Sequence, residues 1–155
     1  MNRQYRSKLA VALLCAGLTT LAAAADLVIS QVAPFSGPLA PTGSHIKAGA
    51  QLYFDVVNAG GGIHGAKITL TSRDDGYKAP ETLRLTQEAL KNDRPVALFG
   101  IVGTGNVETL LKEKAVEGAG IPLVTMRSGA ASVVNSGNPW LFHTRASYAD
   151  EVGKI

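Results

Sequence analysis

Residues 96–125 read VALFGIVGTGNVETLLKEKAVEGAGIPLVT, and this stretch decides the fold class because it contains a complete strand–helix–strand unit. The apolar run 96–99 ends at Gly100 and predicts a short buried strand. Apolar residues then recur at helical spacing over 107–115, and glycines close this helix before a second apolar run at 121–125. Two strands joined through a helix favour a parallel pair, since parallel strands need a crossover connection.

The same alternation extends along the rest of the chain. Apolar strands that alternate with helices predict an α/β fold, a parallel sheet flanked by helices. The expected strands are 27–33, an edge or half-covered strand with alternating polar and apolar residues at 67–71, and 140–143. One expected helix stops at 58–62 and carries Ile46, Ala50, Tyr53, Phe54 and Val57 on one face. Another helix runs from Pro80 to about Asn92, and a last one opens with a capping box of Ser147 and Asp150.

The first 25 residues have the order of a secretory signal peptide. Arg3, Arg6 and Lys8 precede an apolar stretch at 9–21, and small residues follow it up to Ala25. The apolar stretch is shorter than the roughly 20 residues that a membrane-spanning helix needs. We therefore expect cleavage after residue 25 and a periplasmic protein, with a permanent membrane anchor as the weaker alternative.

The composition of the mature chain excludes several classes of function. Removal of residues 1–25 takes away three of the 15 Lys and Arg residues and none of the 12 Asp and Glu residues, so the mature chain is formally neutral. This balance gives no reason to expect nucleic acid as a partner. The single cysteine, Cys15, lies in the expected signal peptide. A mature chain without thiols has no disulfides, thiolate metal sites or cysteine nucleophiles.

Three unusual loops follow expected strands, at 34–43, 100–105 and 127–134. Ligands of open parallel sheets bind beyond the carboxyl ends of the strands, so these loops are the candidate sites. The first loop stands where a phosphate-binding loop would stand, but Ser44 occupies the position of its lysine. It remains a polar turn suited to a carboxylate, in which Thr42 and Ser44 either face the ligand or act as N-caps of the helix.

The second and third loops carry further candidate binding residues. The second loop has two of the three glycines of a dinucleotide fingerprint, with Glu108 in place of the third. We expect instead a close backbone approach to a small ligand, with the Thr104 hydroxyl as donor or acceptor. In the third loop the small residues 128–131 leave room beside free N–H groups. Arg127 either grips a ligand carboxylate with two hydrogen bonds or is a solvated surface arginine.

No metal site and no catalytic site are expected. His45, His64 and His143 fall in separate predicted elements without ligand spacing. Asp74–Asp75 is interpreted as turn chemistry at a strand end, because no further acidic residue falls at EF-hand spacing. The nucleophile motif Gly-x-Ser-x-Gly is missing, and no base can be assigned to any serine. The sequence therefore predicts no cofactor and no enzymatic activity.

A succession of short motifs runs in order through nearly the whole mature chain. They are Ser36-Gly37-Pro38 with Gly43, Gly49-Ala50, residues 55–65 (DVVNAGGGIHG), Asp74-Asp75, residues 100–104, residues 120–123 (GIPL) and residues 142–145 (FHTR). This order resembles the type I periplasmic binding proteins of branched-chain amino-acid-type ABC importers. No single motif is specific, and the succession carries the resemblance.

The resemblance implies a protein of two lobes that closes on its ligand by hinge motion. Residues 26–144 would form the N-terminal ligand-binding lobe, and residues 145–155 would form the crossover and the start of the second lobe. Relatives continue for a comparable length again, and the last expected helix reaches Ile155 without a C-cap. We therefore expect most of the second lobe to be missing from this chain.

The resemblance also implies the site and the partners. Hydroxyls and backbone amides of the three loops would hold the carboxylate of a small-molecule ligand, an amino acid or a related carboxylate, which is passed to an ABC transporter permease in the membrane. Thr42 and Arg127 depart from the leucine-type pattern, so polar, dicarboxylate and non-amino-acid ligands stay open. By position the ligand-binding residues are Thr42, Thr104, Gly105, Arg127, Ser128 and Gly129.

Two alternatives to a transport protein stay open. The first is a ligand-sensing receptor domain of the same fold, which reports its ligand to a signalling partner. The second is an exported α/β enzyme, which no residue of the sequence supports.

Overall fold

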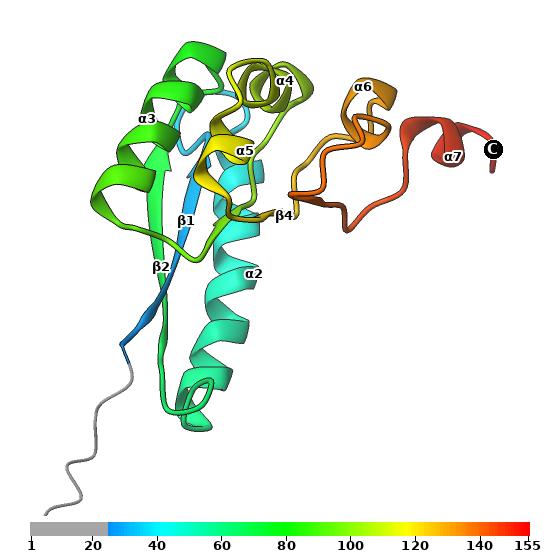
Figure 1. The fold of residues 1–155 in the computed structure, drawn as a ribbon. Coiled ribbons are helices and arrows are strands. Elements are labelled where there is room, and N and C mark those ends of the chain that lie inside the picture. The colour runs from blue at the N-terminus through cyan, green and yellow to red at the C-terminus, as the bar shows by residue number, and fades with distance from the viewer. Residues whose placement is uncertain (1–24) are drawn as a thin grey trace, which may run out of the picture.

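A five-stranded parallel sheet lies at the centre of the structure, a computed structural model that describes residues 25–155 (Figure 1). The expected signal peptide lies outside the described residues except for its last position. The strand order is β2-β1-β3-β4-β5, and every neighbouring pair is parallel, which confirms the predicted fold class. The strands are β1 (Leu27–Ala33), β2 (Ile68–Asp74), β3 (Ala97–Phe99), β4 (Leu123–Val124) and β5 (Leu141–Phe142).

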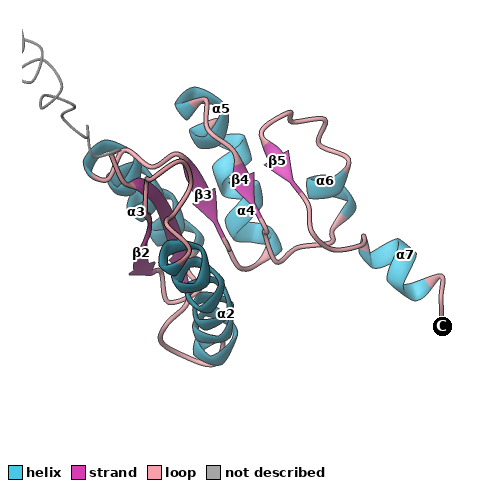
Figure 2. Cartoon of the chain, turned by 90° about the horizontal axis from the view of Figure 1, so that it is seen from below, coloured by secondary structure: helices cyan, strands magenta, loops and turns pink. Residues whose placement is uncertain are grey.

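The strand β1 lies between β2 and β3 and pairs with both. It pairs along its whole length with β2, from Leu27 opposite Ile68 to Ala33 opposite Asp74. On its other side Ile29 lies opposite Ala97 of β3. The short strands β4 and β5 extend the sheet beyond β3, and Figure 2 shows these three strands side by side. The strand β2 lies at the edge of the sheet, as its alternating pattern predicts.

The helices are divided between the two faces of the sheet. The connection from β1 to β2 runs in one direction and the later connections run in the other, so right-handed crossovers place α2 on one face and α3, α4 and α5 on the opposite face. Figure 1 shows α3 and α2 on opposite sides of β1 and β2. The helices are α2 (Ala40–Ala59), α3 (Ala79–Asn92), α4 (Thr104–Lys112), α5 (Ala115–Ala119), α6 (Ala131–Val134) and α7 (Tyr148–Val152).

The main hydrophobic core lies between the sheet and the helices α3, α4 and α5. Inward-facing residues of three neighbouring strands, Val32, Leu98 and Leu123, are completely buried. Burial of such a side chain contributes about 1.5–3 kcal/mol each, so this layer fixes how the strand ends are arranged. The rest of the buried cluster is formed by Leu85, Ile101, Val107, Leu110, Val116, Met126 and Val133.

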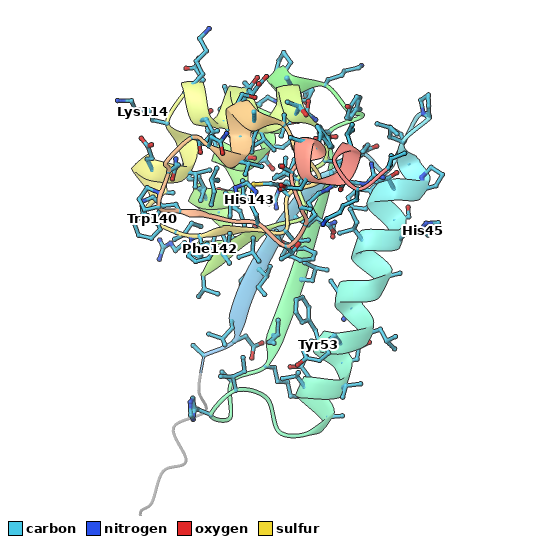
Figure 3. All side chains as sticks on the ribbon, turned by 90° about the vertical axis from the view of Figure 1, so that its right-hand side faces the viewer. His45, Tyr53, Lys114, Trp140, Phe142 and His143 are labelled. Carbon is cyan, nitrogen blue, oxygen red and sulfur yellow. The ribbon has the colours of Figure 1, made fainter. Side chains whose placement is uncertain are left out.

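The helix α2 packs on the other face and comes closest at its first turn. Gly43 is its only buried residue. A Cβ atom at this position would overlap the carbonyl oxygen of Pro34 and lie 2.9 Å from its carbonyl carbon. Further along, Phe54 meets Phe99 of β3 edge-on with ring centroids 6.5 Å apart. Tyr53 was expected on the buried face of α2, but it is 67% exposed on the side of the helix (Figure 3).

Several boundaries differ from those predicted. The third predicted helix is split into α4 and α5, because Lys114 adopts a left-handed conformation with φ of 52°. The fourth strand is shorter than 121–125, since Thr125 also has a positive φ of 58°. The third loop contains the unpredicted short helix α6. The last helix, α7, begins with the predicted capping box but ends at Val152 instead of reaching the last residue.

Within residues 25–155, no helix combines the length and the hydrophobicity that a membrane-spanning helix needs.

Candidate ligand-binding site

The second and third loops meet at the carboxyl ends of β3 and β4. Val102 and Arg127 form an isolated parallel bridge just beyond the two strands. The Arg127 N–H donates to the Ile101 carbonyl oxygen at 2.8 Å, and the Gly103 N–H donates to the Arg127 carbonyl oxygen at 3.3 Å. These backbone bonds bring together two loops that the sequence could only place at the same edge of the sheet.

The bridge places two predicted hydroxyls in direct contact, Thr104 and Ser128, which we call the hydroxyl pair. Their Oγ1 and Oγ atoms are 2.9 Å apart. Ser128 is completely buried and Thr104 is half-buried. The Ser128 Oγ also accepts a 3.3 Å bond from the Ala130 N–H. Because each hydroxyl can turn its proton toward a guest, the pair can donate to the oxygens of a carboxylate.

Two predicted glycines flank the hydroxyl pair. Gly105 is exposed in the first turn of α4, and Gly129 is buried directly after Ser128. A Cβ atom on Gly129 would lie 2.8 Å from the Cδ1 atom of Tyr148, so this position cannot carry a side chain without moving that ring. The four residues, two from each loop, thus lie next to one another in the chain and across the contact between Thr104 and Ser128.

An aromatic residue that the sequence pattern did not indicate, Tyr77, lies beside the second loop. The ring of Tyr77 covers Gly103, where an added Cβ atom would be 2.5 Å from the Tyr77 Cε2 atom. Tyr77 has a strained positive φ of 62° and is 47% exposed. Its N–H donates to the Oδ1 atom of Asp75 at 2.8 Å. The only signal in the sequence is an aromatic residue in a turn after two aspartates, which does not by itself indicate a site.

Asp75 is buried and ties the end of β2 to two helices. Its Oδ2 atom accepts a 2.6 Å bond from the Thr82 hydroxyl of α3 and a 3.4 Å bond from the Asn106 side chain of α4. Burial raises the pKa of Asp75, and the bonds from Thr82 and the Tyr77 N–H oppose that rise. This carboxyl group thus positions the first turn of α4, which carries Thr104.

Asp74 holds the first loop. Its Oδ1 atom accepts hydrogen bonds from the N–H groups of Phe35 at 2.8 Å, Gly76 at 2.9 Å and Ser36 at 3.2 Å. These bonds, led by that of Phe35, lower the pKa of the Asp74 carboxyl group below its usual value. The interpretation of Asp74–Asp75 as turn chemistry is confirmed, because both carboxylates bind backbone N–H groups of turns.

Asp74→Ala is expected to loosen the first loop without unfolding the protein. The substitution removes the shared acceptor of three N–H groups, each bonded to a charged oxygen. We expect the amide protons of Phe35 and Ser36 to exchange about tenfold faster or more, measured by hydrogen exchange. Asp55→Ala is the control, since within residues 25–155 the Asp55 side chain accepts only from Gln51 on the exposed side of α2. Equal exchange in both variants would contradict this role of Asp74.

The first loop is shorter than predicted, and this corrects the position of Thr42. The helix α2 begins at Ala40, with Leu39 as its N-cap residue and Pro41 in its first turn. Proline is favoured at this early position, because a backbone N–H there would have no acceptor within the helix. Thr42 and Ser44 are therefore helical residues, and the suggestion that they are N-caps is wrong. Thr42 lies in the first turn, half-buried, next to the Gly43 contact.

Arg127 is exposed. It lines a cavity of about 460 Å³ together with Arg145 and Glu151, which form an ion pair with each other. The cavity thus presents one arginine from the third loop and one from the segment after β5. Its remaining lining residues are Ile46, Thr125, Met126 and Thr144.

The described residues contain no group of three or more His, Asp and Glu side chains placed to hold a metal ion. His45 lies on α2 and His143 follows β5, on separate parts of the fold (Figure 3).

The known proteins to which this chain is similar are binding proteins. The family model described as "Periplasmic binding protein" matches residues 27–155. The Leu/Ile/Val-binding protein homolog 8 of Brucella abortus is 35% identical over 124 residues, which cover 79% of this chain and 30% of that protein. A substrate-binding periplasmic protein from Ralstonia solanacearum has 43% identity and a TM-score of 0.79, covering 83% of this chain and 36% of that one.

A third relative shows a bound ligand. It is the solute-binding protein of an ABC transporter from R. palustris in complex with benzoate, with 29% identity, a TM-score of 0.68, and coverage of 79% of this chain and 33% of that one. This chain spans about a third of the length of each of these three relatives. The relatives are solute-binding proteins, and their shared architecture is the parallel sheet described above. The chain belongs to the periplasmic binding protein family, in its type I, branched-chain amino-acid group.

Proposed function

We propose that this chain is part of an extracytoplasmic solute-binding protein of an ABC importer, which binds an amino acid or a related small carboxylate between two lobes. In this proposal residues 26–144 form the N-terminal lobe and residues 145–155 begin the passage to the second. The protein acts in the periplasm after removal of residues 1–25, and a membrane permease receives its ligand. No catalytic step and no cofactor are involved.

The observation that carries the proposal is the hydroxyl pair. Two hydroxyls from different loops, 2.9 Å apart, lie at the carboxyl edge of a parallel sheet, where this class of fold binds its ligands. Gly105, exposed beside Thr104, adds backbone to the pair, whereas Gly129 beside Ser128 is buried. A carboxylate can accept up to four hydrogen bonds, and bonds to a charged oxygen are about twice as strong as neutral ones.

The relatives support a carboxylate rather than one particular ligand. One is named as a homolog of a Leu/Ile/Val-binding protein and another was solved with benzoate. Leucine and benzoate share a carboxylate and an apolar remainder, but only leucine has an ammonium group. The hydroxyl pair matches the shared part. Arg127 at the cavity provides a positive charge that favours anionic ligands, because the charge of its neighbour Arg145 is balanced by Glu151.

Thr104→Val is expected to weaken carboxylate binding about tenfold, because it removes one hydroxyl of the pair while keeping the shape of the side chain. Ser128→Ala should have a similar effect, and the double variant should bind little more weakly than either, since the two hydroxyls act together. The measurement is isothermal titration of the mature protein with leucine and with benzoate.

Thr109→Val is the matched control. It lies further along α4, and among the described residues its hydroxyl bonds only to the Gly105 carbonyl oxygen of its own helix. We expect unchanged affinity in this variant. Undiminished binding in Thr104→Val and Ser128→Ala would show that the hydroxyl pair is not the carboxylate site.

A further inference from the structure

The ring of Tyr77 rests on Gly103, the residue directly before Thr104. A Cβ atom on Gly103 would lie 2.5 Å from the Tyr77 Cε2 atom, 2.9 Å from its phenol oxygen and 3.0 Å from its Cζ atom. The end of the ring therefore occupies the space that a side chain of residue 103 would take. Tyr77 comes from the turn between β2 and α3, whereas Gly103 belongs to the second loop, so this contact joins two segments that are distant in sequence.

Gly103 is the joint between the second loop and α4. It is the N-cap residue of α4, and its carbonyl oxygen accepts a bond from the Val107 N–H at 3.1 Å. Its own N–H donates to the Arg127 carbonyl oxygen in the third loop at 3.3 Å. Its φ of 101° is a conformation that only glycine adopts readily, and glycine has no side chain that restricts its rotation. A rotation at this joint would move Thr104 relative to Ser128.

The backbone of Tyr77 is anchored by Asp75. The Tyr77 N–H donates to the Oδ1 atom of Asp75 at 2.8 Å, and Asp75 is only 2% exposed and is bonded to Thr82 of α3. The φ of Tyr77 is 62°, and residues other than glycine keep such a conformation only where their surroundings impose it. Tyr77 is half-exposed and lies outside the buried hydrophobic cluster. The turn thus holds a ring against Gly103 that contributes little to the core.

We infer that Tyr77 is a positioning residue of the candidate site: its ring covers Gly103 and thereby holds the second loop so that the Thr104 hydroxyl meets that of Ser128. The inference rests on the proposed function, and Tyr77 acts on the ligand only through Thr104. Without the ring, Gly103 gains conformations in which the two hydroxyls are apart. The affinity for every ligand then falls by the same factor, the fraction of molecules in which the hydroxyl pair is assembled.

The test replaces Tyr77 with asparagine, which lacks the ring but tolerates a positive φ and keeps the N–H that bonds to Asp75. We expect Tyr77→Asn to bind leucine and benzoate about fivefold more weakly, by the same factor, in isothermal titration of the mature protein. Tyr77→Phe keeps the ring carbons over Gly103 and should regain most of this loss. Tyr53→Asn, at an exposed position of α2, is the control and should leave both affinities unchanged.

A double variant separates positioning from direct contact with the ligand. If Tyr77 acts through the Thr104 hydroxyl, Tyr77→Asn should cost little further affinity in a Thr104→Val background. A full fivefold loss in that background, or unequal losses for leucine and benzoate, would mean that the ring touches the ligand and would overturn the inference. Unchanged affinity in Tyr77→Asn alone would overturn it as well.

Hydrogen exchange tests the inference without a ligand and separates it from the proposed function. In Tyr77→Asn the amide of Gly103, bonded to the Arg127 carbonyl oxygen, should exchange about fivefold faster or more. The amide of Leu98, bonded to the Pro122 carbonyl oxygen within the sheet, should exchange as before. An unchanged Gly103 amide would overturn the inference even if the affinity falls. A faster Gly103 amide in a protein that binds neither leucine nor benzoate would instead reject the proposed function.

Discussion

Gly43→Ala is expected to lower the free energy of unfolding by about 2–3 kcal/mol, although alanine is the better helix former. The added Cβ atom would overlap the carbonyl oxygen of Pro34, which is backbone and cannot rotate away. The first turn of α2 must then move off the end of β1. Urea denaturation of the mature protein, followed by circular dichroism, measures the loss.

Gly49→Ala in the same helix is the matched control. Its added Cβ atom would meet no heavy atom within 4 Å. Without a clash, the smaller conformational entropy of the unfolded alanine chain should stabilise the protein by about 0.5–1 kcal/mol. The two glycines are thus expected to respond with opposite signs. A loss of the same size at both positions would mean that helix propensity, and not the contact with Pro34, determines the effect.

The sequence predicted the sheet and most helices because both depend on local periodicity. The strand β1 has the predicted bounds, and the helix α3 begins within one residue of its prediction. The periodic pattern could not show where the chain adopts a left-handed conformation. Lys114 and Thr125 have positive φ values, which are uncommon for residues other than glycine. Lys114 interrupts the predicted helix and Thr125 shortens the predicted strand, and neither residue type indicates such a break in the sequence.

The candidate site was predicted in part for a similar reason. The rule for strand ends placed Thr104 and Ser128 at the same edge of the sheet, but their contact depends on the bridge between Val102 and Arg127. Tyr77 and Tyr148 reach the site from distant segments, and their positions depend on contacts with Gly103 and Gly129 that only the folded chain provides. Sequence spacing carries no information on such contacts.

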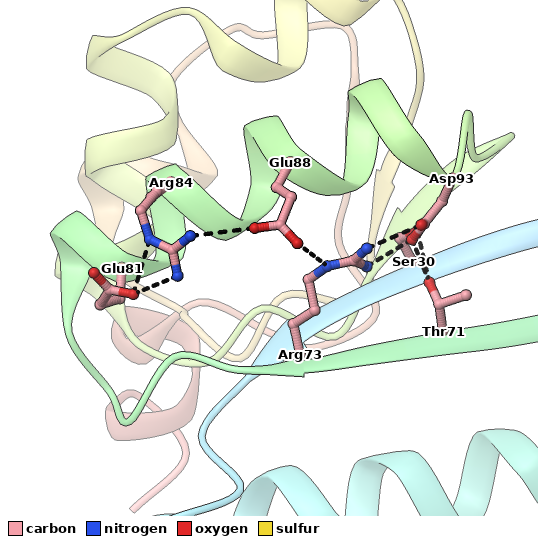
Figure 4. A network of polar contacts seen from close by, with 7 residues as sticks. All are labelled: Ser30, Thr71, Arg73, Glu81, Arg84, Glu88 and Asp93. Atoms are coloured by element: carbon pink, nitrogen blue, oxygen red, sulfur yellow. Dashed lines mark hydrogen bonds and ion pairs between the residues drawn. The ribbon is translucent and has the colours of Figure 1, made fainter.

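A partly buried polar network joins β1, β2 and the end of α3 on the far side from α2 (Figure 4). Asp93 accepts two bonds from the Arg73 guanidinium, at 2.6 and 2.9 Å. It also accepts from the hydroxyls of Ser30 at 2.9 Å and Thr71 at 2.8 Å. These four bonds satisfy the carboxylate in a place with little access to water, where an unpaired charge would be costly.

Asp93→Asn is expected to remove about 2 kcal/mol of stability at pH 7 and almost none at pH 2. The bond from Arg73, with those from Thr71 and Ser30, lowers the pKa of Asp93 from 3.8 to about 2. A carboxyl group whose pKa is lower in the folded state stabilises the fold fully above its unfolded pKa and loses this contribution as the pH falls. The difference between 3.8 and about 2 corresponds to about 2 kcal/mol, lost between pH 4 and pH 2.

Glu81→Gln is the control for this pH dependence. Glu81 pairs with Arg84 in the same region (Figure 4), but both side chains are more than 40% exposed, so water and salt screen the pair. We expect no measurable change in the urea midpoint at any pH. From pH 7 down to pH 2 the urea midpoint of Asp93→Asn should therefore approach that of the unmodified protein, and the midpoint of Glu81→Gln should coincide with it throughout. A constant difference for Asp93→Asn across this range would assign its effect to altered packing, because only the ionised carboxylate gives a stability that disappears on protonation.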